Sequence, residues 1–406
     1  MNLKRTLRNC SEVGLMSWDI MRGKYPSFIY GRKIAKRDVP AFCFHDAEPR
    51  RFEAMLNYLK DNDYTSITSA DLGDILLRKE NEKFRHPVCI TFDDGLASIW
   101  NTAYPLLKKY GFRATVFLIP DRIQSSPLYL PNLEDVWAGK ATPEELDARS
   151  RGRYPFATWE EIREMHDSGV MDFQSHSLRH TLVFTSPKII DFVSPYNLEV
   201  YSVFQFSMFK ELDLQTPDKH KLRPGSPVYE SAPRLAGKPE YLEDPCLKEY
   251  CIGFVENHGG NEFFKRKNWK SILLRAAKDH RATHPSLDGL ESMDTTRQAI
   301  LDELKLSKQR IEEQLHGKVV EHMCLPWGVG GPLTTALCQQ VGYKTIFTGR
   351  ANGNTKLTVD SDPYSVYRLG PDFFYCLPGK GRRSVFTVMK DKVLRRAREG
   401  THYLSY

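Results

Sequence analysis

Short apolar runs rich in β-branched and aromatic residues alternate with segments of helical periodicity along much of this chain. Eight runs are typical of buried strands, and they lie at 39–44, 64–68, 87–92, 114–119, 170–175, 319–325, 343–348 and 364–369. Between them, apolar spacing predicts helices at about 49–61, 70–79, 97–110, 158–168, 295–315 and 333–341. This alternation predicts a parallel α/β sheet, either open or closed into a barrel.

One long segment interrupts the alternation. From about residue 182 to 294 the chain is rich in Pro, aromatic and charged residues and has only weak periodicity. A structureless loop of that length is uncommon inside a compact domain. We therefore expect an insertion that folds as a small subdomain or cap over 182–294.

Two adjacent carboxylates follow the third predicted strand. In Thr91-Phe92-Asp93-Asp94-Gly95 they come where that strand ends, and the carboxyl ends of parallel strands are where α/β proteins place their active sites. Asp-Asp-Gly is also a common turn, so the motif alone leaves both interpretations open.

Two histidines follow a later predicted strand. His176 and His180 stand four residues apart, and if the chain is helical there, both imidazoles share one face and can chelate one cation. A third motif, Pro326-Trp327-Gly328, ends another strand, so all three converge on one rim of the predicted sheet.

The combined set of side chains has the composition of a hydrolytic metal site. Two imidazoles and one carboxylate can hold a divalent ion with an open position for water, and a second carboxylate can take a proton from that water. Zn is the expected metal for this set, and Fe, Co, Ni or Mn are chemically reasonable as well.

At this point the sequence resembles the polysaccharide deacetylases with a NodB homology domain, which form carbohydrate esterase family four. Their first motif matches residues 91–95 and their second, His-Ser/Thr-x-x-His, matches 176–180. The resemblance implies a distorted (β/α) barrel over 39–181 and 295–370. It also implies N-deacetylation of acetylated amino sugars, with Asp93 as the general base and Asp94, His176 and His180 as metal ligands.

The same resemblance assigns three further residues through incomplete motifs. Only the end of the third family motif, Arg-x-Pro-Tyr-Gly, is present here, and Cys324 stands where the Arg is expected. Trp327 takes the aromatic position, and the resemblance implies that its backbone N–H helps to bind the oxyanion. The family's late Leu-x-x-His is absent. His45 resembles the N-terminal histidine of members that also lack that motif and is expected to be the general acid; Arg368 resembles their late arginine and is expected to orient Asp93.

Charge and chain ends suggest where such an enzyme acts. The formal net charge is +7, and residues 380–406 carry eight Lys or Arg against Asp391 and Glu399. These residues belong to a basic C-terminal tail over 371–406. We expect residues 380–406 either to contact an anionic membrane surface or to pack as a terminal helix with a solvated basic face. No nucleic-acid-binding motif accompanies it, so no nucleic acid is expected as a partner.

The first residues hold no apolar run typical of a secretory signal, no stretch reaches the roughly 20 apolar residues of a spanning helix, and the eight cysteines lack Cys-x-x-Cys spacing. Residues 1–38 are therefore expected to form an N-terminal extension, and the cysteines to be small buried thiols. The protein is expected to be cytoplasmic and to act in solution or peripherally at the inner membrane face.

Three functions remain open from the sequence. The first is an N-deacetylase for the amino sugars of a glycan or a glycan precursor, with a lipid-linked precursor among the candidates. The second is an amidase that uses the same metal site on a small non-sugar amide. The third is a catalytically silent glycan-binding relative, which the intact Asp-Asp and His-His pairs disfavour.

Overall fold

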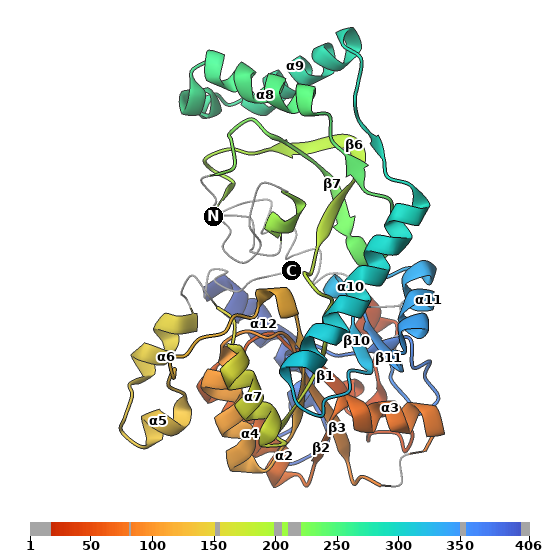
Figure 1. Ribbon diagram of the computed structural model, residues 1–406. Helices are drawn as coiled ribbons and strands as arrows, with labels where there is room; N and C mark the ends of the chain where they lie inside the picture. Colours follow the sequence, from red (N-terminus) through yellow and green to blue (C-terminus); the bar gives the residue numbers. More distant parts are fainter. Residues whose placement is uncertain are drawn as a thin grey trace.

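The computed structural model describes residues 18–80, 83–150, 155–198, 205–209, 221–349 and 355–398. Eight parallel strands form one sheet in the order β1-β3-β4-β5-β10-β11-β12, with β2 beside β3. The sheet nearly closes, because Phe42 of β1 bridges to Leu369, just beyond β12, and the Leu369 N–H donates to the Ala41 carbonyl at 2.8 Å. The expected distorted (β/α) barrel is confirmed, and it carries a large insertion (Figure 1).

The barrel elements lie close to their predicted positions. The strands are β1 Ala41–Phe44, β2 Thr65–Ile67, β3 Pro87–Asp94, β4 Ala114–Leu118, β5 Met171–Ser175, β10 His322–Cys324, β11 Thr345–Thr348 and β12 Val366–Tyr367. The helices are α2 Pro49–Asp61, α3 Ser69–Arg78, α4 Tyr104–Tyr110, α7 Trp159–Asp167, α10 Met293–Gln314 and α11 Pro332–Val341.

The segment after the two carboxylates differs from its prediction. Instead of one helix over 97–110, a π-helical turn, η2 Ile99–Ala103, runs into α4. Two short helices, α5 Leu133–Trp137 and α6 Pro143–Ser150, were also not predicted. They span too few turns to set up a recognisable helical period.

Local sequence explains why the barrel elements begin and end where they do. Every residue of β3 is buried, as expected for an inner parallel strand. Thr68 and Thr158 each form a capping box, with Asp71 and Glu161, at the first turns of α3 and α7. These caps satisfy backbone N–H groups that would otherwise lack partners at the helix starts.

Strand alternation separates two apolar layers. On β1 and β3, Phe42, Phe44 and Phe92 face the covering helices, whereas Ala41 and Cys89 face the barrel interior. The interior is packed across its width, since the rings of Phe117 on β4 and Phe347 on β11 stand 4.8 Å apart. This aromatic pair forms a floor beneath the carboxyl ends of the strands.

The insertion builds on one end of the barrel (Figure 1). Strands β6 Leu182–Phe192 and β7 Pro227–Pro233 pair antiparallel, as do the short β8 Tyr241–Leu242 and β9 Gly289–Leu290. Helices α8 Pro245–Asn257 and α9 Trp269–Thr283 pack on each other at the end far from the barrel. Buried Arg234 ties the base of the insertion together through ion pairs with Glu240 and Glu291.

The basic tail forms helix α12, Val385–Arg398, which packs on the turn η10, Pro371–Cys376. Val385 and Val388 are buried, and the largely buried carboxylate of Asp372 pairs with Lys392 and Arg395. Among the described residues, every helix is too short or too polar to cross a bilayer.

Two helical glycines provide a test of packing against helix propensity. A Cβ at Gly73 in α3 would lie 2.7 Å from Cε1 of buried His322, whereas a Cβ at Gly253 in α8 would meet nothing within 4 Å. We expect Gly73→Ala to destabilise the fold by about 1–3 kcal/mol, since the imidazole must move. Gly253→Ala should stabilise it by about 0.5–1 kcal/mol. Urea unfolding measures both, and a stabilised Gly73→Ala would contradict this packing.

Candidate active site

The predicted site residues come together at the carboxyl ends of the strands. His45 follows β1, the two carboxylates end β3, the two histidines follow β5, Trp327 follows β10 and Arg368 follows β12. Because these strands are parallel neighbours in a nearly closed sheet, residues far apart in sequence meet at one rim.

Asp94, His176 and His180 form a compact, buried group. His176 Nε2 lies 3.5 Å and His180 Nε2 lies 4.0 Å from Asp94 Oδ1, and the three ligand atoms lie within 4.8 Å of one another. Ligand atoms around a tetrahedral ion with bonds of about 2.0–2.3 Å stand roughly 3.3–3.8 Å apart. The group therefore fits a divalent ion with only small side-chain adjustments.

The protonation of both imidazoles suits this use. Burial lowers the pKa of His176, and it holds the pKa of His180 well below its usual value. Both rings are then neutral near pH 7, as metal ligation requires. His176 Nδ1 is 2.8 Å from the Cys324 carbonyl, which orients the ring with Nε2 toward Asp94.

The backbone at this rim is strained. Seven non-glycine residues in the described part of the chain have positive φ, and four of them are at the site: Asp94, Ser177, His180 and Trp327. Such conformations cost of order 1–3 kcal/mol each and concentrate at functional sites. The turn after β5 is thus not the helix that would place two imidazoles on one face; the left-handed residues bring the rings together instead, with centroids 4.9 Å apart.

Asp93 forms a bidentate ion pair with Arg368. Arg368 donates from Nη1 to Asp93 Oδ1 at 2.6 Å and from Nη2 to Oδ2 at 2.7 Å. Burial alone would raise the pKa of Asp93, but the positive charge of Arg368 and the nearby imidazoles lower it below the usual range. The guanidinium in turn lies over the rings of Phe117 and Phe347.

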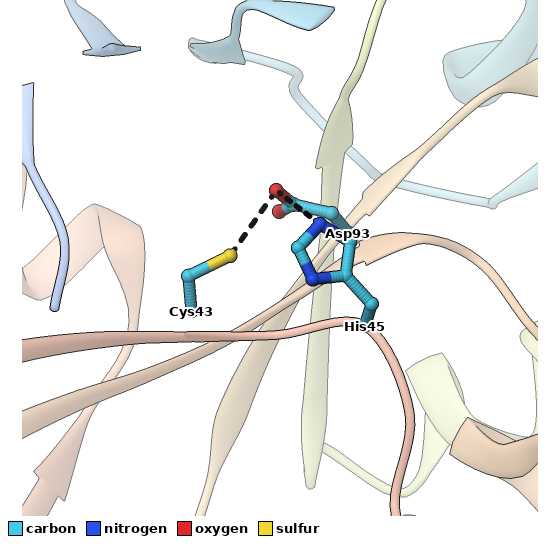
Figure 2. Close-up of side chains that lie close together, drawn as sticks. All are labelled: Cys43, His45 and Asp93. Carbon is cyan, nitrogen blue, oxygen red and sulfur yellow. Dashed lines mark hydrogen bonds and ion pairs between the residues drawn. The ribbon is translucent and has the colours of Figure 1, made fainter. Parts of the chain in front are cut away.

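Two thiols and one imidazole also approach Asp93. Figure 2 shows Cys43 and His45 directed at the same carboxylate oxygen, with Cys43 Sγ 3.4 Å and His45 Nε2 3.9 Å from Oδ2. Cys324 Sγ lies 3.6 Å from that oxygen. The sequence argument did not assign the thiols to the site, although period-two alternation on β1 and β10 would have pointed both side chains inward.

His45 is partly exposed, with 38% of its side chain accessible. Burial of the ring lowers the pKa of His45 to about 4, against the opposing pull of Asp93. The imidazole is therefore neutral near pH 7 and must accept a proton before it can donate one.

Trp327 lies beside the histidine pair. Its ring centroid is 4.0 Å from that of His180, and its backbone is left-handed at φ 54°. Gly328 allows the loop to pass close to β11, since a Cβ there would lie 2.3 Å from the Gly349 nitrogen. The loop places the backbone of residue 327 at the rim, next to the metal-ligand group.

A buried carboxylate outside the motifs supports the histidine turn. Glu303 of α10 accepts the backbone N–H of Arg179 and its guanidinium, both at 3.1 Å. Ser177 Oγ accepts the His180 N–H at 3.0 Å within the same turn. Glu303 was not identified from the sequence, because a single Glu on a long helix carries no motif.

Fold and site together define a (β/α)-barrel protein with a buried cluster of side chains that can hold a divalent metal and a neighbouring carboxylate at the carboxyl ends of its strands. Residues 80–193 match the family model for polysaccharide deacetylase. The chain therefore carries a polysaccharide deacetylase domain of the NodB-like type, and the family resemblance is confirmed.

The curated relatives match over part of their length. The poly-β-1,6-N-acetyl-D-glucosamine N-deacetylase of Staphylococcus epidermidis is 31% identical over 129 residues, which cover 32% of this chain and 36% of that protein. YxkH of Bacillus subtilis, provisionally named a polysaccharide deacetylase, is 29% identical over 131 residues, again 32% and 36% of the two chains. The matched part thus spans about a third of these relatives.

Among solved structures, the BpsB deacetylase domain of Bordetella bronchiseptica is 17% identical, with a TM-score of 0.48, and the match covers 83% of this chain and 97% of that one.

The contact between Glu303 and the histidine turn makes a prediction about metal binding. Glu303→Ala removes the acceptor that holds the strained turn, so we expect metal affinity to fall by about 10–100-fold. Asp302→Ala, at the exposed neighbouring position on α10, is the matched control and should bind as the parent does. Competition with a chromogenic chelator measures both, and equal affinities would show that Glu303 does not position the ligands.

Proposed function

We propose that this protein is a metal-dependent hydrolase that removes N-acetyl groups from the amino sugars of a glycan or glycan precursor. The observation that carries the proposal is the placement of the Asp93 carboxylate beside the buried Asp94, His176 and His180 ligand group. The similarity to poly-β-1,6-N-acetyl-D-glucosamine N-deacetylases supports an acetylated glucosamine polymer as the substrate class.

In this proposal Asp94, His176 and His180 hold the ion, for which zinc suits the donor set. The ion supplies Lewis-acid activation of water and of the amide carbonyl under attack. Asp93 takes the proton of the attacking water, and the two hydrogen bonds from Arg368 keep that carboxylate ionised and hold its orientation. The backbone N–H of Trp327 contributes to binding of the oxyanion.

The leaving amine needs a proton, and His45 is the group placed to carry it. His45 Nε2 lies 3.9 Å from Asp93 Oδ2, so a proton accepted by Asp93 can pass to this imidazole through one water or after the ring moves closer by about 1 Å. A ring with a pKa near 4 releases that proton readily to an amine. By this route His45 can act as the general acid even though its imidazole is neutral before the reaction.

A small-molecule amidase using the same site is the second candidate. One observation favours the polymer instead. An open groove between α8 and α9 is lined in part by Tyr250, Phe254, Arg275 and Asp279, the combination of rings and polar groups that sugars pack against. It lies at the end of the insertion away from the barrel, so only an extended ligand could reach both places (Figure 1).

Acetate release tests the proposed reaction. Full-length protein with one equivalent of zinc should release acetate from oligomers of β-1,6-linked N-acetylglucosamine and lose that activity with a chelator. We expect Asp93→Asn and His45→Ala each to lower the rate by about 10²–10⁴-fold with metal content unchanged. His180→Ala should lose the metal. Full activity in Asp93→Asn, or release only from small non-sugar amides, would contradict the proposal.

We further propose a cytoplasmic location with peripheral contact to an anionic membrane, where lipid-linked precursors would be available. Seven free cysteines in the described residues are consistent with a reducing compartment. The α12 surface retains exposed Phe386, Lys390, Val393 and Leu394. Lys392 and Arg395, however, are engaged by Asp372, so fewer cations face outward than the tail's composition suggests.

Vesicle sedimentation tests the membrane contact. We expect the full chain at low salt to bind vesicles that contain anionic lipid and to release them at high salt, because each surface cation contributes about 1 kcal/mol. Phe386→Ser with Lys390→Gln should weaken this binding, whereas Leu274→Ser with Lys278→Gln on α9, also exposed, should not. Absence of binding by the parent protein would remove the membrane proposal.

A further inference from the structure

A second set of metal-ligand atoms lies beside the first. Cys43, His45 and Asp93 bring a thiol, an imidazole and a carboxylate within 4.8 Å of one another (Figure 2). None of these three residues belongs to the Asp94, His176 and His180 group. The donors differ as well, because a sulfur atom replaces one imidazole nitrogen.

The two sets are alike in geometry. In the first set the imidazole nitrogens lie 3.5 and 4.0 Å from the shared carboxylate oxygen. In the second, Cys43 Sγ and His45 Nε2 lie 3.4 and 3.9 Å from Asp93 Oδ2. A tetrahedral ion with bonds of about 2.0–2.3 Å places its ligands roughly 3.3–3.8 Å apart. The second set is thus as close to a metal-binding arrangement as the first.

The fold holds these donors in place. Cys43 pairs in register with Thr91 on β3, so strand alternation turns its side chain toward the barrel interior, where Asp93 also points. Arg368 fixes the Asp93 carboxylate by binding both oxygens. Burial raises the pKa of the Cys43 thiol, so the thiolate forms only as the ion binds. The negative charges of this thiolate and of Asp93 then offset the repulsion between the guanidinium and the ion.

We propose that Cys43, His45 and Asp93 form a second metal site, selective for thiophilic divalent ions such as Zn²⁺ or Cd²⁺. On binding, the S–H bond of Cys43 breaks, its proton passes to solvent and a sulfur–metal bond forms. Harder ions such as Mn²⁺ gain little from a thiolate and bind only at the first site.

Occupation of this site has a consequence that rests on the proposed function. An ion bound by Asp93 and His45 occupies the lone pairs that the proposed reaction uses to move protons. Excess Zn²⁺ or Cd²⁺ therefore inhibits acetate release, whereas excess Mn²⁺ does not. The site itself does not depend on the proposed activity, and binding can be measured without it.

Cadmium titration of the full chain tests the site. Equilibrium dialysis should give two Cd²⁺ but one Mn²⁺ per chain, and the second Cd²⁺ should bring a thiolate-to-cadmium charge-transfer absorption in the ultraviolet. Cys43→Ser should bind one Cd²⁺ and show no such absorption. His45→Gln, a second variant that spares the thiol, should weaken the second Cd²⁺ by at least about ten-fold.

Cys246→Ser is the matched control, because among the cysteines that the structure describes Cys246 is the exposed one, which adventitious Cd²⁺ would reach most easily. It should retain both ions and the absorption. One Cd²⁺ in the parent protein, or an unchanged second ion in Cys43→Ser, would overturn the second site. Two ions without inhibition would instead count against the proposed roles of Asp93 and His45.

Discussion

The ion pair between Arg368 and Asp93 is the contact on which the rest of the site depends. Both partners are buried, and removing one of them leaves an uncompensated charge at a cost of about 3–5 kcal/mol. The Arg368 guanidinium lies over the rings of Phe117 and Phe347, so the packing of the barrel interior fixes its position along the barrel axis. It also bonds Thr91 and Cys324, and thereby joins β3, β10 and β12 at one point.

The ion pair and the strained turns perform separate tasks. Arg368 keeps Asp93 charged and oriented without using it as a metal ligand. The left-handed residues Asp94, Ser177 and His180 aim the neighbouring ligands inward, and the Glu303 contact from α10 supports that turn. In the proposed function, a site assembled this way separates metal ligation from proton transfer while keeping the two carboxylates adjacent in sequence. This separation also leaves Asp93, Cys43 and His45 available to compete for an ion of their own.

The sequence predicted a parallel α/β sheet because its strands are continuous apolar runs, and such runs report burial directly. That the sheet closes into a barrel was implied by the family resemblance. It predicted which residues share the rim, since motifs at the ends of parallel strands must meet. It did not predict the left-handed histidine turn, because the four-residue spacing suits a helix equally well. The roles of Cys43 and Glu303 also escaped it: a thiol within an apolar strand resembles core, and the contact of Glu303 with Arg179 spans 124 positions.

The central claim is that Asp94, His176 and His180 hold the metal beside a carboxylate that does not bind it. The most direct test is anomalous diffraction from crystals of protein loaded with one equivalent of zinc. We expect a single anomalous peak bonded to Asp94 Oδ1 and to Nε2 of both histidines, with Asp93 still paired to Arg368. A peak bonded to Asp93 and Cys43 at one equivalent, or no peak at this rim, would contradict the account.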